Sequence, residues 1–231
     1  MKRLLLFFLV VMVCVPQLSA RRKKPKAGEV DHGTYSDASY GFHFNVSDGW
    51  DYKVQDDDKH YRLVLTQVNW QVPPDYLDSP DYTHIPKIVV WVDTTSLGLF
   101  PFIDSLLSES FKSDQKSELF KEFEILVDDT ERDEMQQRGR RTKEIAGEKG
   151  IHWTGYAQYT KDVQLSASSV GGKRVKGAYG GSIIGVKHGN QIILFHMMSE
   201  WLYHPQIDAE LVGMVNTLQF GGSEESRPEK K

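Results

Sequence analysis

The 231-residue chain contains one cysteine, Cys14, and one long hydrophobic run, Leu4–Val15. A single cysteine excludes an intrachain disulfide scaffold and a zinc–thiolate site. A single hydrophobic run excludes a protein that crosses a membrane many times. Positive charge is not in excess either, because 28 basic residues face 32 acidic ones, so the chain lacks the overall basic character of nucleic-acid-binding domains. The remaining composition, 39% hydrophobic and 26% charged, is typical of one globular domain with a core.

The N-terminus has the three parts of a secretory signal peptide. Lys2 and Arg3 precede the hydrophobic run Leu4–Val15, and a small residue, Ala20, offers a cleavage site. A twelve-residue helix is roughly 18 Å long, which is too short for a hydrocarbon core of roughly 30 Å. The pattern predicts export to the periplasm or the medium. Retention by an uncleaved N-terminal segment is the alternative, because Leu18 is large and five basic residues follow the cleavage site.

Charge and composition divide the chain into four parts. We expect a signal peptide at 1–20, a basic flexible linker at 21–33, one globular domain at 34–220 and a disordered polar tail at 221–231. Residues 27–220 contain 18 basic and 29 acidic residues, a net charge of −11, whereas 21–26 contains five basic residues. The segment 21–26 could therefore contact an anionic lipid or a cell-wall polymer weakly, and a solvated linker is the alternative.

The first half of the domain has strand patterns followed by helical ones. Alternating hydrophobic residues predict strands at 40–44, 60–68 and 88–92, with a long proline-rich loop at 73–86. Hydrophobic residues at helical spacing predict a helix that begins near Pro101. A second helical stretch is predicted around 117–123.

The second half returns to strands and closes with a helix. Alternation predicts a strand at 151–160, then a hairpin with arms at 182–186 and 191–198. Both faces of the second arm are hydrophobic, which is typical of a central strand. A last helix is predicted from Pro205, with a hydrophobic stripe that reaches Leu218. This order predicts an α+β fold in which helices cover a mainly antiparallel β-sheet.

Three sequence features resemble the PsbP/Mog1-like domains. They are the aromatic strand 40–44 followed by Trp50, the stretch 146–153 that ends in Trp153, and the terminal hairpin that runs into 207–220. The resemblance implies an antiparallel sheet between helices, an α/β/α sandwich, over residues 34–220. Known roles in that family are binding and assembly, and its bacterial members include exported proteins of unknown function.

No stretch of the sequence matches a known catalytic or metal-binding motif in full. Gly180–Gly185 nearly matches a nucleophile elbow around Ser182, but its last glycine comes one residue late and its context is a hairpin strand. Gly172–Gly177 lacks the lysine and hydroxyl residue of a phosphate-binding loop and is interpreted as a flexible basic loop. Asp56–Asp58 lacks the remainder of a calcium loop and is interpreted as a solvated turn. We therefore assign no catalytic residue, no metal site and no cofactor from the sequence.

Two further groups of polar residues have competing interpretations. His196 and Glu200 share a face if their strand extends that far, and they could then form part of a hydrolase site that converges only in the fold. A satisfied core histidine is the simpler interpretation of His196. The basic residues of 138–143 are expected to pair with the acidic run 128–134.

Exposed aromatic residues are the best binding candidates. Tyr76 and Tyr82 lie in the long loop, and Trp201 and Tyr203 precede the last helix. Residues before a helix can also close the end of a sheet, which is the structural alternative. The sequence predicts a non-catalytic exported binding or assembly module whose partner is a protein of unknown identity and not a nucleic acid. An envelope hydrolase with a site near His196 and Glu200 is the alternative.

Overall fold

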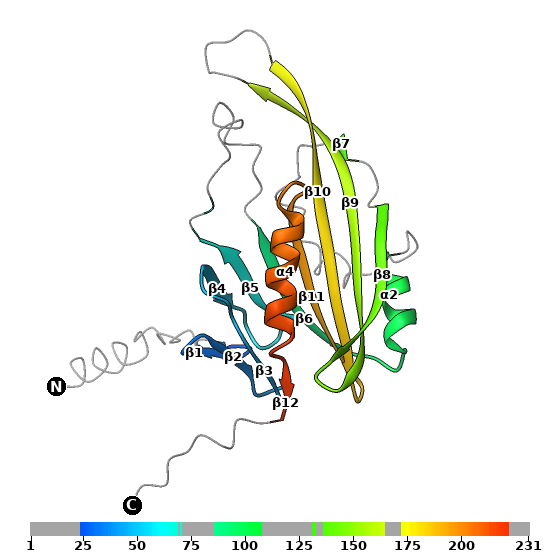
Figure 1. Ribbon diagram of the computed structural model, residues 1–231. Coiled ribbons are helices and arrows are strands. Elements are labelled where there is room, and N and C mark those ends of the chain that lie inside the picture. Colours follow the sequence, from blue (N-terminus) through cyan, green and yellow to red (C-terminus); the bar gives the residue numbers. More distant parts are fainter. Residues whose placement is uncertain are drawn as a thin grey trace, which may run out of the picture.

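The described part of the chain forms two antiparallel β-sheets and two helices (Figure 1). A computed structural model describes residues 24–68, 70, 86–107, 131–132, 136–164 and 172–221. Every strand pair in these residues is antiparallel. The prediction of an α+β fold with a mainly antiparallel sheet covered by helices is confirmed.

The larger sheet has the strand order β4-β5-β6-β11-β10-β9-β7, and β8 also pairs with β9. Its strands are β4 (Trp50–Val54), β5 (Tyr61–Gln67), β6 (Lys87–Thr94), β7 (Glu131–Arg132), β8 (Gln136–Ile145), β9 (Glu148–Gln164), β10 (Gly172–His188) and β11 (Gln191–Glu200). β11 lies between β10 and β6, as its hydrophobic faces predict. The predicted hairpin is also confirmed, because β10 and β11 pair from His188 and Gln191 outwards.

The smaller sheet has the strand order β1-β2-β3-β12. Its strands are β1 (Glu29–Asp31), β2 (Thr34–Asp37), β3 (Phe42–Asn45) and β12 (Gln219–Phe220). The pairing of β12 with β3 brings the end of the domain back to its beginning. Helix α4 (His204–Val215) crosses one face of the larger sheet, and α2 (Leu99–Leu107) packs near the β8 edge (Figure 1).

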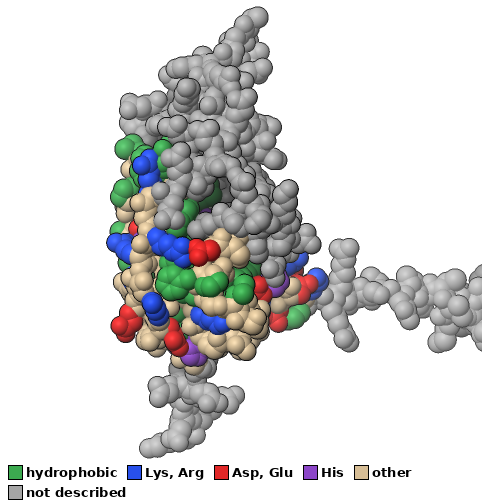
Figure 2. All heavy atoms as spheres, turned by 90° about the vertical axis from the view of Figure 1, so that its right-hand side faces the viewer, with side chains coloured by type: hydrophobic (Ala, Val, Ile, Leu, Met, Phe, Trp, Pro, Cys, Tyr) green, Lys and Arg blue, Asp and Glu red, His purple; other side chains and the backbone are tan. Residues whose placement is uncertain are grey.

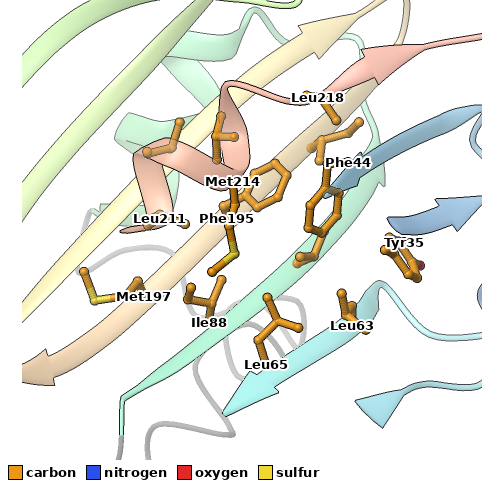
Figure 3. Close-up of a cluster of buried hydrophobic side chains, with 14 of the residues drawn as sticks. Tyr35, Phe44, Leu63, Leu65, Ile88, Phe195, Met197, Leu211, Met214 and Leu218 are labelled. Atoms are coloured by element: carbon orange, nitrogen blue, oxygen red, sulfur yellow. The ribbon is translucent and has the colours of Figure 1, made fainter. Parts of the chain in front are cut away.

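Hydrophobic side chains fill both faces of the larger sheet. One core cluster joins α4 and the smaller sheet to one face, and Figure 3 shows its side chains converging between α4 and the strands. Phe44 of the smaller sheet meets Phe195 of β11 edge to face at 5.1 Å between ring centroids. A second cluster joins α2 to the opposite face around Trp91 and Trp153. The predicted stripe of the last helix is confirmed, since Ile207, Leu211, Met214, Val215 and Leu218 are all buried.

A buried ion pair attaches the smaller sheet to β5. The side chains of Arg62 and Asp37 are both 0% exposed, and Nε of Arg62 donates to Asp37 at 2.7 Å. The same guanidinium donates to the Asp57 carboxylate and to the carbonyl oxygens of Ala27, Asp57 and Lys59. The Tyr35 hydroxyl donates to Asp37 at 3.2 Å, and burial together with that carboxylate raises the pKa of Tyr35. One arginine therefore ties together segments that are far apart in the sequence.

Three sequence interpretations need correction. Residues 24–33, assigned to a flexible linker, belong to the fold, since β1 pairs with β2 and Ala27 is 1% exposed. Residues 172–177, interpreted as a flexible loop, form the first part of β10 and pair with β9 from Gly172 onwards. The turn 56–58, interpreted as solvated, also makes ion pairs with other segments. Asp56 pairs with Lys26, Asp57 with Arg62 and Asp58 with Lys24.

Candidate functional site

Five polar side chains form a continuous chain of hydrogen bonds between α4 and the larger sheet. We call it the polar chain; its members are Arg141, His152, Asp208, Ser182 and His204. His152 Nε2 lies 2.8 Å from Asp208 Oδ1, and Ser182 Oγ lies 2.6 Å from the same oxygen. His204 Nε2 lies 3.0 Å from Ser182 Oγ, and Arg141 Nη2 lies 2.9 Å from His152 Nδ1. β8, β9, β10 and α4 all contribute to it.

The chemistry of the groups gives each hydrogen bond a direction. A guanidinium only donates, so His152 Nδ1 accepts from Arg141 and Nε2–H donates to Asp208. The Ser182 hydroxyl has one hydrogen and donates it to Asp208, so its oxygen accepts from His204. Asp208 is the final acceptor of both arms. The polar chain therefore fixes α4 on the sheet, and the buried His152, Ser182 and His204 each have a hydrogen-bond partner in it.

A glycine allows this close approach of α4. A Cβ atom on Gly180 of β10 would lie 2.3 Å from the imidazole Cδ2 of His204, which is inside van der Waals contact. The ring of His204 therefore rests directly on the backbone of β10. The Gly180–Gly185 segment has this packing role, and it lies in a hairpin strand as the sequence predicts.

The polar chain contains serine, histidine and aspartate but does not have the order of a catalytic triad. In a triad the histidine links the nucleophile to the carboxylate, so that it can take the proton of the hydroxyl. Here the Ser182 hydroxyl donates to Asp208 itself, and the whole Ser182 residue is 0% exposed. A substrate carbonyl could not reach that oxygen without removal of α4. The geometry fits a structural network.

Burial lowers the pKa of His204, although the negative charge of Asp208 acts in the opposite direction. For Asp208, burial would raise the pKa, but the hydrogen bonds from His152 and Ser182 outweigh it, and the pKa is lowered. His204 binds a proton more weakly in the folded protein than in the unfolded chain. The folded protein therefore loses stability as the pH falls below 6.5, the ordinary pKa of histidine. The contribution of Asp208 is present above its ordinary value of 3.8 and is lost only as the pH falls through its lower folded value.

We therefore expect the free energy of unfolding to decrease as the pH is lowered from 7 to the pKa of His204 in the folded protein. The slope contributed by one proton is at most about 1.4 kcal/mol per pH unit. His204→Gln, which can still donate to Ser182, should flatten this part of the profile. Urea unfolding at a series of pH values measures it, with His32→Asn as the control at an exposed histidine. An unchanged slope in His204→Gln would contradict the role of His204.

Next to the polar chain, aromatic and cationic side chains form a stacked row at the surface. The guanidinium carbon of Arg138 lies 3.7 Å from the Tyr156 ring centroid. Tyr156 and Trp201 have ring centroids 5.4 Å apart, and Trp201 stacks on His204 at 5.6 Å. Trp201 is 41% exposed and the neighbouring Leu202 is 71% exposed. The row thus runs from an exposed arginine to the buried polar chain.

The structure separates the predicted binding residues. Trp201 belongs to the stacked row and is exposed. Tyr203 is half-buried and meets Trp70 edge to face at 4.9 Å, so it closes the core beside α4. Tyr76 and Tyr82 lie outside the described residues. The proline-rich loop 73–86 lies outside the described residues except for Pro86, and the second predicted helical stretch, 117–123, lies wholly outside them.

The residues of the alternative hydrolase site lie elsewhere. β11 does extend to Glu200, so His196 and Glu200 share a face as the sequence suggests. Both are buried, and this face is opposite to the one that α4 covers. The structure does not bring them into the polar chain. Arg140 has a carboxylate partner in Asp104 of α2. The side chains of the acidic run 128–134 lie outside the described part of the chain, so its expected pairing with 138–143 stays a prediction.

Two properties concern the described part of the chain only. In those residues no group of three or more histidine, cysteine, aspartate or glutamate side chains is arranged to hold a metal ion. No helix within them is both long enough and hydrophobic enough to span a membrane.

Sequence reasoning missed most of the polar chain. Ser182 drew notice only through the glycine pattern around it, and His152 only as part of the family resemblance. Asp208 is one acidic residue in an amphipathic helix, and no motif surrounds it. The signal that could have identified it is its position directly after the buried Ile207, one turn into that helix and close to the buried stripe.

Comparison with known proteins finds similarity in structure only. No known family and no curated protein matches the chain by sequence. Among solved structures, PsbP of the cyanobacterium Synechocystis sp. PCC 6803 is 12% identical, with a TM-score of 0.38, 84% of this chain and 96% of that chain covered.

Two further solved structures are similar. LpqN of Mycobacterium tuberculosis, involved in cell envelope biogenesis, is 7% identical, with a TM-score of 0.45, 85% of this chain and 89% of that one covered. PA94 of Pseudomonas aeruginosa, a protein of unknown function, is 10% identical, with a TM-score of 0.36, 88% and 99% covered. All three similarities have low sequence identity and a low TM-score. They concern the fold alone and say nothing of function.

Proposed function

We propose that this chain is a non-catalytic, exported binding module that holds a protein partner at the surface around Trp201. The observation that supports this most is the exposure of Trp201 and Leu202, at 41% and 71%, on a turn whose backbone is firmly held. The Trp201 amide donates to the Ala178 carbonyl at 2.9 Å, and α4 follows directly. A rigid exposed tryptophan loses little entropy when a partner covers it, and tryptophan, tyrosine and arginine dominate binding energy at interfaces.

The neighbours of Trp201 support the same proposal. Tyr156 and Arg138 extend the row with residue types that are enriched at interfaces. The polar chain beneath keeps Trp201 in place through its stacking on His204. By contrast, Ser182, His152 and His204 are buried and take part in the hydrogen bonds of the polar chain. The surface around Trp201 therefore fits a binding role better than a catalytic one.

Export, the second part of the proposal, is supported by the signal-peptide pattern at 1–20. The basic segment that follows is partly occupied, because Lys24 pairs with Asp58 at 2.7 Å and Lys26 with Asp56 at 2.9 Å. Weak contact with an anionic surface would then fall mainly to Arg21–Lys23. N-terminal sequencing of the protein recovered from the envelope fraction checks the cleavage after Ala20.

Trp201→Ala should abolish capture of the partner, because truncation of a central aromatic residue typically costs at least about 2 kcal/mol, or about 30-fold in affinity. The full-length chain and its variants are used as bait in the native envelope fraction, and recovered proteins are quantified by mass spectrometry. The partner so identified is then titrated in purified form.

Tyr52→Ala is the matched control for this experiment. Tyr52 is an aromatic residue of similar exposure, 48%, on the distant edge strand β4. The proposal requires a protein that binds the parent and Tyr52→Ala equally but not Trp201→Ala. Equal binding by all three baits, or turnover of a substrate that is lost in Trp201→Ala, would overturn it.

A further inference from the structure

Positive charge is concentrated in the part of the larger sheet that carries the stacked row. Residues 136–188, which contain β8, β9 and β10, include ten basic and three acidic residues, a net charge of +7. The whole chain has a net charge of −4, so the rest of it is strongly acidic. Figure 2, which faces the side of α2 and β8, shows lysine and arginine side chains among hydrophobic ones, with several aspartate and glutamate side chains beside them. A surplus of positive charge in one part of a protein favours contact with anionic groups.

Arg138 is placed to bind a carboxylate. Its guanidinium lies on the face of Tyr156, and the residue is exposed. Stacking leaves the N–H groups at the rim of the guanidinium available for in-plane hydrogen bonds, and a carboxylate can accept two of them at once. No carboxylate of the described residues lies within ion-pair distance of Arg138 or Arg141. These two cations are therefore unneutralised by that part of the chain.

Arg141 and Lys143 extend the positive surface along the α4 face of β8. Residues two positions apart on a strand share a face, so Arg141 and Lys143 lie on the same face as Ile145. Ile145 packs into the core on the α4 side of the sheet. Arg141 uses Nε and Nη2 on His152 and keeps Nη1 for another acceptor. A row of cations thus runs beside the exposed Trp201 and Leu202.

Basic residues on an edge strand can also serve to prevent pairing with other strands. That role explains neither the stacking of Arg138 on Tyr156 nor the presence of exposed hydrophobic side chains beside it. A membrane surface fits less well than a peptide. The cations of β8 lie on both faces of the sheet, with Arg140 paired to Asp104 on the α2 side. Among the residues that the structure describes, Trp201 and Leu202 are the exposed large hydrophobic residues of this region.

On this basis, and resting on the proposed binding function, we infer that the partner docks through an acidic peptide segment. Its carboxylates would bind Arg138 and Arg141, and a neighbouring hydrophobic side chain would cover Trp201 and Leu202. Charge complementarity selects the sequence, and the hydrophobic contact adds affinity.

The test measures binding of a peptide of alternating glutamate and leucine to the full-length chain by calorimetry. We expect binding that weakens as NaCl rises from about 0.05 M to about 0.5 M, because screening shortens the range of the attraction. Arg138→Ala should lower the affinity about tenfold, which corresponds to about 1.4 kcal/mol. Arg138→Lys should restore only part of it, since lysine cannot bind a carboxylate through two parallel hydrogen bonds.

The matched control is Arg140→Ala, which removes a cation from the same strand on the opposite face and should leave the affinity unchanged. A peptide of alternating glutamine and leucine separates the two proposals. If it binds as well as the acidic peptide and Trp201→Ala abolishes both, the binding surface stands and the inference of an acidic partner is wrong. No binding of the acidic peptide, or binding only to vesicles of phosphatidylglycerol, also overturns the inference.

Discussion

Replacement of Arg62 by methionine should lower the free energy of unfolding by about 3 to 5 kcal/mol, the usual cost of removing one partner of a buried ion pair. The substitution leaves the Asp37 carboxylate at 0% exposure, without its charged partner. Three carbonyl oxygens, those of Ala27, Asp57 and Lys59, lose a donor as well. The attachment of the smaller sheet to β5 should therefore be the first part of the fold to fail.

Urea unfolding of the full-length chain, followed by circular dichroism, measures the effect of Arg62→Met. The double variant with Asp37→Ala should lose less than the sum of the two single losses, because no charge is then left alone at this position. Asp58→Ala is the control, since its ion pair with Lys24 is exposed and should contribute nothing measurable. A stability of Arg62→Met within about 1 kcal/mol of the parent would contradict the role of the pair.

Asp208→Ala is expected to have the second largest effect, a loss of about 2 to 4 kcal/mol, because two buried donors lose their common acceptor. These donors are the Ser182 hydroxyl and His152 Nε2–H, both with side chains inaccessible to water. Asp208→Asn keeps one carbonyl oxygen and should lose less. Hydrogen exchange of the α4 amides should rise in Asp208→Ala, since the helix is less firmly held on β10.

The control for Asp208→Ala is Gln206→Ala, an exposed position in the same helix that should leave stability and exchange unchanged. The experiment also separates a structural polar chain from a catalytic one. A structural chain predicts lower stability together with weaker partner binding, because Trp201 stacks on His204. Unchanged stability with loss of a hydrolytic activity would support the catalytic alternative instead.

Patterns local in sequence predicted the elements that local physics controls. The turn at Gly189 has a φ of +57°, as the His188–Asn190 segment predicts for a hairpin. The hydrophobic spacing from Ile207 onwards predicted α4 and its buried face. The same reasoning mistook 172–177 for a flexible loop. Its glycines and cations have low strand propensity, but long pairing with β9 outweighs that preference.

Contacts between distant segments could not be predicted in this way. The partners Arg62 and Asp37 are 25 residues apart, and Asp208 is 56 residues from His152. No periodicity connects such residues, because hydrogen bonds between elements depend on how the elements pack. Of the binding candidates, sequence singled out Trp201 but could not separate it from Tyr203, which lies two positions away and is half-buried.

By itself, the sequence determined the class of this protein. Its single cysteine, its balanced charge and its alternation of strand and helix patterns predict an α+β domain without disulfides. Each of these is a property of composition or of neighbours along the chain. Only the tertiary structure decided that Arg62 holds two sheets together, that the serine and histidines of the α4 face are buried and that Arg138, Tyr156 and Trp201 share one surface. Burial and long-range proximity arise when distant strands pair and helices cover them, so they exist only in the folded chain.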